Sequence, residues 1–297
     1  MDIEIRKITE LTEIYAILDL MKDIWTLSDL EIVASFEMKA VSTFGVLLGA
    51  FDHDTSDNKL VGFIYGFPRF PNSHHSHQMG VDKKYQSKNV GFLLKKAHRS
   101  LALTSTNPQV IQIEWTVDPL LGPNANLNFR KLGVICNTYY PNFYGDPKGA
   151  VDLYPSVPTD RILVKWNLTL DRVNDRFDNN NPRKPAWTSI DDLFKEFPPL
   201  IELKLTNNRL QLPYSNSLGD LITEDRDEWS MEIPDDYTNQ SKIDIEWAMK
   251  WRIAFRNICM SMFERGYYLI DFFSFPQSNK IRRNAFIFSR DIYGYKY

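Results

Sequence analysis

The 297-residue sequence is poor in cysteine, and it lacks both a long apolar run and an excess of charge of either sign. Its two cysteines, Cys136 and Cys259, cannot build a disulfide framework or a zinc site made of several thiolates. No apolar run approaches the roughly 20 residues that a helix needs to cross a bilayer. The start, Met1–Arg6, is acidic from its second residue and has neither the basic segment nor the apolar stretch of a signal peptide. We therefore expect a cytoplasmic protein that does not associate with a membrane.

The charges are balanced, with 35 Lys+Arg against 38 Asp+Glu and a formal net charge of −3. A protein whose affinity for nucleic acid depends on counterion release usually carries a clear positive excess. The balance therefore argues against nucleic acid as a partner. Hydrophobic residues make up 43% of the chain and charged ones 25%, which is the profile of a folded globular protein with a sizeable core.

Strand-like and helix-like patterns alternate along residues 1–170, which favours an α/β or α+β domain. The strands that we expect are residues 3–5, 44–51, 60–65, 76–81, 110–117, 134–140 and 161–168. The expected helices are residues 14–25, 90–101 and 124–132, and Gly133 is a candidate C-cap for the last of them. Turn residues at 52–58 predict a hairpin between the second and third strands, so at least part of the sheet is expected to be antiparallel.

Composition changes at Asp171–Pro185, where Asp178–Pro185 is rich in asparagine and proline and is the best linker candidate. Residues 191–297 have a pattern of their own. Strands are expected at 200–205, 229–233, 267–275 and 285–288, and Trp247, Trp251 and Phe255 mark one face of a long helix. We expect a domain at 1–170, a linker at 171–190 and a smaller C-terminal α+β extension at 191–297. The extension either stands alone or continues the first sheet.

The segment Val81–Gly91, with the sequence VDKKYQSKNVG, connects an expected strand to an expected helix. A strand that turns directly into a helix exposes unpaired backbone N–H groups, which favour an anion. Gly91 would let the backbone approach a phosphate closely, and Asn89 tolerates left-handed geometry. Positive charge is added by three lysines: Lys83, Lys84 and Lys88. The blander interpretation is a solvated helix start with ordinary surface lysines.

The end of this segment, Gln86–Gly91, resembles the acyl-CoA signature of the GNAT superfamily of N-acyltransferases, Gln/Arg-x-x-Gly-x-Gly/Ala, with Asn89 in place of the first glycine. Further along, Asn124–Gly133 looks like the Asn-rich helix of that family, which ends in Lys-Leu-Gly. The resemblance covers residues 1–169 in element order. A closer likeness, to a little-characterised branch of predicted GNAT proteins with a C-terminal extension, is carried by the strings WTVDP, NANLNFRKLG, YYPNFYG, PTDRILVKW, MEIP and WRIAFR.

The resemblance implies a GNAT-like mixed, mostly antiparallel sheet with flanking helices. It also implies acetyl-CoA or another acyl-CoA as co-substrate, with no metal. The pyrophosphate of CoA would lie on backbone N–H groups of the turn, and the pantetheine arm would pair with the preceding strand where two central parallel strands separate. The residues implied in binding CoA are Met79, Gly80, Val81, Gln86, Ser87, Lys88, Asn89, Val90, Gly91, Asn124 and Asn126. For the two asparagines of the second block, helix N-capping is the alternative.

Acyl transfer to an amine requires that the amine lose a proton and that the oxyanion be stabilised, and the departing thiolate can also need a proton. By resemblance, the oxyanion would be held by backbone N–H groups near Met79–Val81. The usual tyrosine acid of the family corresponds to Phe129, which cannot donate a proton. Either a downstream tyrosine replaces it, or the thiolate leaves unaided. The candidates are Tyr139, Tyr140 and Tyr144, for which aromatic packing is the alternative role.

His75 and His77 are the first candidates for the base, because residues two apart point to one face of a strand and an imidazole titrates near pH ~6.5. Their alternatives are a polar loop or, together with His74, a metal site, although no carboxylate or cysteine companion is evident. Asp118 is another candidate, at the end of the next strand and before Pro119. Its alternative role is to cap the following turn.

Arg252 and Arg256 lie one helical turn apart and could bind a carboxylate or phosphate of the acceptor, or form internal ion pairs with Asp271 or Glu232. Together these features predict an acyl-CoA-dependent N-acyltransferase that transfers an acyl group directly to an amine. The alternative is a non-catalytic acyl-CoA-binding sensor or interaction module. The departures from the family pattern at Asn89 and Phe129 favour that alternative.

Overall fold

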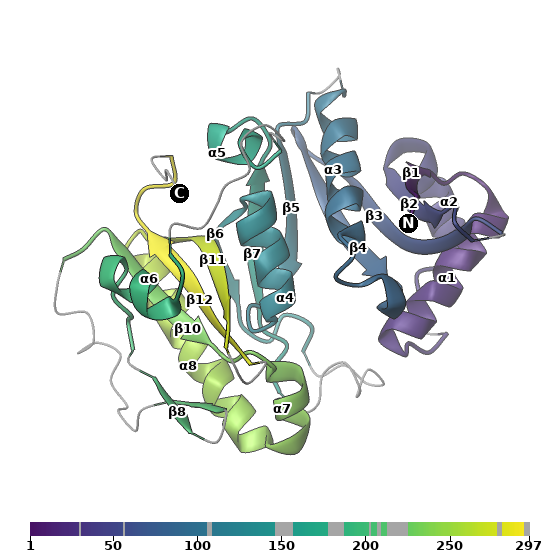
Figure 1. Ribbon diagram of the computed structural model, residues 1–297. Coiled ribbons are helices and arrows are strands. Elements are labelled where there is room, and N and C mark those ends of the chain that lie inside the picture. Colours follow the sequence, from purple (N-terminus) through teal and green to yellow (C-terminus); the bar gives the residue numbers. More distant parts are fainter. Residues whose placement is uncertain are drawn as a thin grey trace. The chain divides into compact units, whose positions relative to one another are not determined.

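The computed structural model describes residues 1–29, 31–55, 57–105, 109–145, 157–177, 187–201, 203–206, 209–212, 225–277 and 281–293. These residues form two compact units. We call residues 1–115 unit 1 and the described residues from 116 to 293 unit 2. Each unit combines a mostly antiparallel sheet with flanking helices (Figure 1), which confirms the predicted fold class. Within the described ranges, no helix is both long and apolar enough to cross a membrane.

Unit 1 contains strands in the order β1-β2-β3-β4-β5. Neighbouring strands are antiparallel from β1 to β4, whereas β4 and β5 are parallel. The strands are β1 (Ile3–Lys7), β2 (Val46–Asp52), β3 (Lys59–Arg69), β4 (Ser73–Val81) and β5 (Gln112–Val117), of which the last two residues belong to unit 2. The helices are α1 (Leu11–Trp25), α2 (Ser35–Phe44), the short 3-10 helix η1 (Lys83–Tyr85) and α3 (Val90–Leu103).

Helices cover both faces of the unit 1 sheet. Successive side chains of a strand point to opposite faces, so neighbouring residues of one strand pack on different helices. Leu47 and Phe63 pack in one apolar cluster with α1 and α2. Leu48 and Ile64, each one residue further along its strand, pack in a second cluster with the start of α3. The two faces of β4 therefore have different surroundings, with α1 and α2 on one side and α3 on the other.

Unit 2 contains strands in the order β7-β6-β11-β12-β10, and every neighbouring pair is antiparallel. One face packs on α6, and the other is centred on Phe286, whose ring lies 5.2 Å from Phe129 and 5.7 Å from Phe255. The strands are β6 (Ile135–Tyr140), β7 (Arg161–Asn167), β8 (Lys204–Thr206), β9 (Arg209–Gln211), β10 (Glu228–Ile233), β11 (Tyr268–Pro276) and β12 (Arg282–Ser289). The helices are α4 (Gly122–Ala125), the π-helical η2 (Asn126–Leu132), α5 (Asp171–Asn174), α6 (Ile190–Glu196), α7 (Tyr237–Ile243) and α8 (Ile245–Glu264).

Most of the expected elements are confirmed, including the hairpin of β2 and β3 and the left-handed C-cap at Gly133. Two expectations were wrong. Phe44 ends α2, a helix that the pattern did not reveal, and does not begin a strand. The strand expected at 200–205 is reduced to β8, which pairs with β9 in a separate two-stranded sheet.

The compact units meet in sequence at Trp115 and Thr116, so they differ from the domains expected at 1–170 and 191–297. That division stays a prediction, and the linker candidate Asp178–Pro185 lies outside the described residues. Within unit 2, β11 pairs with β6 at Leu269 and Cys136. The C-terminal strands therefore continue the sheet that contains β6 and β7.

Candidate functional site

The parallel strands β4 and β5 separate after a short stretch of pairing. Ser73 pairs with Gln112, His74 with Ile113 and His75 with Glu114, and no later residue of β4 pairs with β5, both strands being fully described. On its other edge β4 stays paired with β3 as far as Val81. The edge of β4 from Ser76 onward therefore has backbone groups that β5 does not use, as the predicted cleft requires.

The turn between β4 and α3 holds its shape with its own hydrogen bonds. The Asp82 carboxylate accepts from the Lys84 N–H at 2.9 Å, and the Asp82 carbonyl accepts from the N–H groups of Tyr85 and Gln86. Ser87 (φ 63°) and Asn89 (φ 68°) both have left-handed backbone. Asn89 is the residue before α3 and makes no side-chain capping bond. The left-handed geometry that asparagine tolerates is thus used at this position.

The α3 end of the turn is open to an anion. Residues 86–89 are exposed, and the N–H groups of Val90 and Gly91 have no acceptor within the helix, as is general for a first helical turn. Among the described residues no backbone carbonyl accepts from the N–H of Ser87. The dipole of α3 adds partial positive charge at this exposed turn.

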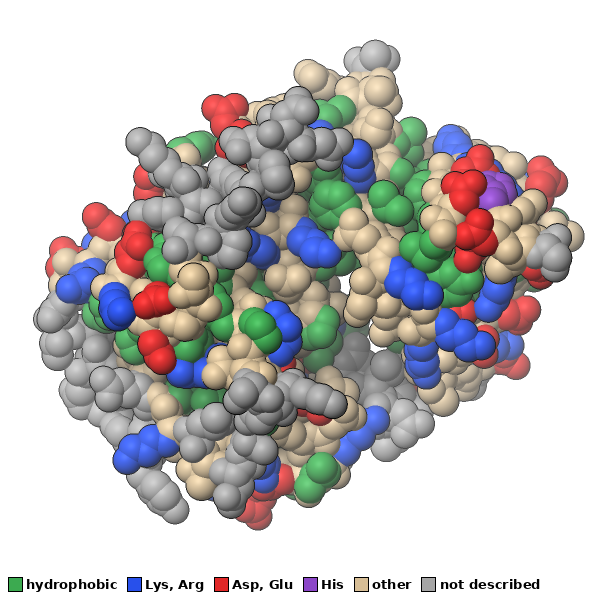
Figure 2. Space-filling model, viewed as in Figure 1, with side chains coloured by type: hydrophobic (Ala, Val, Ile, Leu, Met, Phe, Trp, Pro, Cys, Tyr) green, Lys and Arg blue, Asp and Glu red, His purple; other side chains and the backbone are tan. Residues whose placement is uncertain are grey.

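Lysines surround the turn. Lys83, Lys84 and Lys88 are exposed, and the Lys88 Nζ lies 4.8 Å from the centre of the Tyr85 ring. On the face shown in Figure 2, Lys and Arg side chains gather where β4 runs into η1. Lys59 is bound to Asp82 at 2.9 Å, so it neutralises the only carboxylate within the turn. The local charge therefore favours a polyanion such as a diphosphate.

His77 lies at an irregularity in β4. Gln78 is opposite Tyr65 on β3, and Ser76 is opposite Gly66, so His77 is an extra residue with no partner on β3. Such a β-bulge changes the direction of backbone groups and side chains locally. The bulge residue His77 comes two positions after His75, the last residue paired with β5, and it precedes Met79–Val81 on the unpaired edge.

His75 and His77 share a face of β4, as their spacing predicted. Their rings lie 5.9 Å apart, and both contact Phe67, at 5.3 Å for His75 and 5.6 Å for His77. The polar-loop alternative is wrong, because β4 begins at Ser73. Tyr65 links this face to α2, since its ring lies 5.7 Å from His77 and its hydroxyl donates to Glu37 at 3.3 Å.

The pKa of each imidazole is lowered from its ordinary value. Burial, together with the nearby charges of His77, Arg69 and Lys95, lowers the pKa of His75 to about 4. Burial also lowers the pKa of His77, although the Glu37 carboxylate opposes this shift. A neutral imidazole at pH 7 can accept a proton from an amine, so both residues remain candidate bases.

His74 belongs to the opposite face of β4, so the three histidines do not meet. Its Nδ1 lies 3.2 Å from Nε2 of His98 on α3, and both rings are buried. Within the described part of the chain, no group of three His, Cys, Asp or Glu residues is placed to hold a metal ion.

Asp118 in unit 2 is bound by Arg252 and does not have a free carboxylate. Its oxygens accept from Nη1 and Nη2 of Arg252 at 2.8 and 2.7 Å, and one also accepts from the Leu120 N–H at 2.9 Å. The turn-capping role is thus confirmed. Burial alone would raise the pKa of Asp118, but Arg252 lowers it on balance. A weakly basic carboxylate in a two-point ion pair is unsuited to take a proton, so we leave Asp118 out of the proposed catalytic group.

Arg252 and Arg256 form internal ion pairs, but the expected partners were wrong. Arg252 binds Asp118, and Arg256 binds Asp160 through two bonds of 2.8 and 2.7 Å. Asp271 instead pairs with Arg130 and Arg176, and Glu232 pairs with Arg283. Because their charges are already neutralised, neither arginine of α8 is available for an acceptor carboxylate.

The residues considered as acids are all in unit 2. Phe129 is fully buried, and the Tyr139 hydroxyl donates to Asp160 at 2.8 Å, which explains its buried position. Tyr140 packs on Phe143 with ring centres 5.4 Å apart, and Tyr144 is 49% exposed. A catalytic role for Tyr140 or Tyr144 stays a prediction.

Asn124 and Asn126 do not cap the helix that contains them. The residue before α4 is Leu121, which makes no side-chain capping bond; Asn124 lies inside α4, and Asn126 begins η2. The N-capping alternative is therefore wrong. Asn124 is exposed and Asn126 partly exposed, and their role toward CoA stays a prediction.

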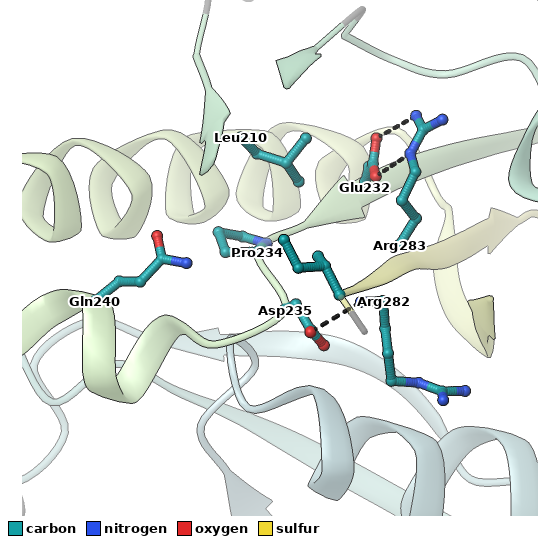
Figure 3. Close-up of a pocket in the computed structure, with 8 residues that line it drawn as sticks. Leu210, Glu232, Pro234, Asp235, Gln240, Arg282 and Arg283 are labelled. Atoms are coloured by element: carbon teal, nitrogen blue, oxygen red, sulfur yellow. Dashed lines mark hydrogen bonds and ion pairs between the residues drawn. The ribbon is translucent and has the colours of Figure 1, made fainter. Parts of the chain in front are cut away.

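A small pocket in unit 2 lies among Leu210, Pro234, Gln240 and several charged residues (Figure 3). Glu232 holds Arg283 through two bonds of 2.8 Å, and Asp235 accepts from the backbone N–H of Arg282 at 2.9 Å. These charged groups already satisfy one another. We therefore take the end of β4, and not this pocket, as the candidate functional site.

Sequence reasoning missed Lys95, which lies on the buried side of α3. Lysine is almost never fully buried without a partner, yet Lys95 is 1% exposed and its Nζ lies 3.0 Å from the hydroxyl of Ser76. The one available signal was its position directly after Leu94, on the apolar side of the helix.

No protein-family model and no curated protein matches the sequence. Among solved structures, Arabidopsis thaliana NAA60 in complex with acetyl-CoA is similar at a TM-score of 0.44 and 15% identity, over 56% of this chain and 99% of that chain. The Escherichia coli ribosomal-protein-S18-alanine N-acetyltransferase gives 0.41 and 15%, over 57% and 96%. A Desulfovibrio desulfuricans protein assigned to the GNAT family of acetyltransferases gives 0.43 and 12%, over 56% and 99%. Because TM-scores below 0.5 describe only a loose likeness, the function proposed below rests on the residues of this chain.

Proposed function

We propose that this chain is an acyl-CoA-dependent N-acyltransferase, which moves an acetyl or other acyl group from CoA to an amine by direct transfer. The observation that carries the proposal is the end of β4. There the strand separates from β5 and leads into an exposed turn with two left-handed residues, Ser87 and Asn89. The turn opens a helix and is surrounded by lysines, which is an arrangement suited to a diphosphate that carries an extended arm.

In this proposal the diphosphate of CoA accepts hydrogen bonds from the N–H groups of Ser87, Val90 and Gly91. The pantetheine arm, which has amide groups of its own, pairs with the edge of β4 at Met79–Val81 that β5 leaves unused. Gly80 keeps the strand close to its neighbours, since a Cβ there would lie 2.7 Å from the Phe63 ring. Gln86 and Lys88 complete the predicted binding set within unit 1.

The acyl group would then lie near the bulge at His77. A neutral His77 takes the proton of the amine as its nitrogen attacks the thioester carbonyl, and N–H groups near Met79–Val81 hold the oxyanion. Transfer is completed when the carbon–sulfur bond breaks and CoA leaves as a thiolate.

Calorimetric titration with CoA, combined with a thioester-consumption assay on a library of amines, tests this function. Micromolar binding together with amine-dependent release of CoA is the expected result. Binding without turnover on any amine would instead favour the non-catalytic acyl-CoA-binding module, and absence of binding would overturn both functions.

Reversal of the charge at Lys88 is expected to weaken CoA binding. We expect Lys88→Glu to raise the Kd about threefold to tenfold, because a carboxylate replaces a cation next to the diphosphate. Lys96→Glu is the matched control, as Lys96 is also exposed but lies in the second turn of α3. Titration at two salt concentrations should show a smaller effect of Lys88→Glu at the higher one, because salt screens surface charges. Equal effects of the two variants would argue against a diphosphate at this turn.

The backbone at Asn89 gives a second test. Asn89→Val should weaken CoA binding about tenfold, because a β-branched residue is strained by roughly 1–3 kcal/mol at a φ of 68° and would distort the turn. Asn89→Gly, which relieves that strain, should bind CoA within about twofold of the wild type. Calorimetry on the three proteins measures this, and unimpaired binding by the valine variant would show that the turn does not hold the ligand.

A further inference from the structure

Lys95 lies at the fork where β4 and β5 separate. Its Nζ is 3.0 Å from the hydroxyl of Ser76 and 3.2 Å from the centre of the Trp115 ring. Ser76 and Trp115 directly follow His75 and Glu114, which are the last paired residues of the two strands. The amine therefore contacts the first residue of each strand beyond the point of separation.

The surroundings of Lys95 offer it a hydroxyl and an aromatic face but no carboxylate within ion-pair distance among the described residues. The charged or titratable groups nearby are His98 on α3, with a buried ring, and His74 and His75 on β4. Burial lowers the pKa of Lys95 well below its usual value, and the pKa values of His74 and His98 are also lowered by burial.

A buried amine without a counter-ion is costly for a folded protein, and methionine would fill the same space without that cost. Perturbed buried groups of this kind are enriched at functional sites. The four-carbon stem of Lys95 fills apolar space, whereas its amine contacts a hydroxyl and an aromatic face. A ligand that binds the amine would give a lysine at this position a function.

We propose that Lys95 binds the sulfur of CoA at this fork and holds the bound coenzyme as a thiolate beside an ammonium. The inference rests on the proposed function, which brings the thiol arm along the unpaired edge of β4. When CoA binds, the S–H bond breaks and its proton forms a third N–H bond on Nζ, so charge is separated but nothing is oxidised or reduced. An acyl-CoA has no S–H proton, so in acyl transfer the amine of Lys95 takes its third proton from water, and the resulting ammonium pairs with the thiolate that leaves.

Stabilisation of the leaving thiolate by Lys95 would also compensate for the lack of an acid at Phe129. A phenylalanine cannot protonate or stabilise a leaving thiolate, and the Tyr139 hydroxyl is already bound to Asp160. Lys95 would supply positive charge from α3 instead. It would act on the leaving group and not on the amine, which is the task of His77.

The test compares CoA with desulfo-CoA, which lacks the sulfur, by calorimetric titration of the full chain. We expect the wild type to bind CoA about tenfold more tightly than desulfo-CoA, because an ion pair with the thiolate is lost in the analogue. Lys95→Met should bind the two with equal affinity and should leave the affinity for desulfo-CoA unchanged. Lys96→Met, an exposed change in the next residue, should keep the tenfold preference. The ultraviolet absorbance of a thiolate should appear when CoA binds to the wild type at neutral pH, and not with Lys95→Met.

Each outcome decides one point. Equal binding of CoA and desulfo-CoA by the wild type, or a preference that survives in Lys95→Met, overturns the inference while the proposed function stands. If the wild type binds neither compound, the proposed function fails and this inference fails with it. If Lys95→Met does not fold, the thiolate absorbance of the wild type is the remaining test. Absence of that absorbance at saturating CoA would overturn the inference.

Discussion

Replacing Arg252 by methionine is expected to lower the free energy of unfolding by about 3–5 kcal/mol, because it leaves a charge uncompensated in a buried place. Arg252 is 2% exposed, and it holds both oxygens of Asp118, which is 13% exposed. The arginine also lies over the ring of Tyr237 at 5.0 Å. Urea denaturation followed by tryptophan fluorescence would measure the loss.

Two further proteins give that prediction its controls. Arg252→Met combined with Asp118→Leu removes both charges, and it should recover much of the lost stability, because an ion pair replaced by apolar groups is often close to neutral. Arg265→Met changes an exposed arginine at the end of the same helix and should stay within about 0.5 kcal/mol of the wild type. If Arg252→Met were no worse than Arg265→Met, the pair would not contribute to stability.

The difference in free energy of unfolding between wild type and Arg252→Met should depend on pH in a definite direction. The pKa of Asp118 is lowered from its ordinary value of 3.8, since Arg252 outweighs the effect of burial. The ion pair therefore contributes fully above that ordinary value, and its contribution is lost as the pH falls through the lower pKa of the folded state. Near neutral pH the gap between wild type and Arg252→Met should be constant, and it should narrow in acid.

The parts of the fold that sequence predicted are those set by local patterns. Alternation placed His75 and His77 on one face, and the turn chemistry at 52–58 gave the β2–β3 hairpin. Gly133 ends η2 in a left-handed conformation, as a glycine after a helical pattern often does. Each of these features depends on residues that are near neighbours in the chain, so periodicity and conformational preference were enough.

The features that sequence did not predict depend on distant residues or on register. Arg252 and Asp118 are 134 residues apart, and nothing local selects Asp118 over Asp271 as the partner. The bulge at His77 follows from how β4 pairs with β3, which a single strand does not encode. Lys95 was missed because a lysine is ordinarily solvated, and only the packing of α3 on β4 buries it. The sequence therefore predicts the turn of the candidate site but not the polar groups around that turn.

His77→Gln is expected to lower kcat of the proposed transferase about 10²–10⁴-fold, which is the usual contribution of a general base. His77 is placed for this role by the bulge in β4, next to the unpaired edge where the acyl group would lie. Its pKa is lowered by burial, so the imidazole is free to accept a proton at pH 7. His75→Gln is the matched control on the same face, and it should cost less than about tenfold, because a pKa of about 4 makes His75 a weak base and Phe67 covers its ring.

The pH profile of kcat/KM distinguishes a base from a residue that only shapes the site. With wild type, activity toward a given amine should fall as the pH drops through the pKa of His77, which lies below 6.5, since the protonated ring cannot accept a proton. The same amine assayed with His77→Gln cancels the ionisation of the acceptor, so the ratio of the two profiles isolates His77. That ratio should be constant at neutral pH and decline in acid. A ratio that is flat throughout, or a larger loss in His75→Gln than in His77→Gln, would assign the base to another residue and leave the acyl-CoA site itself intact.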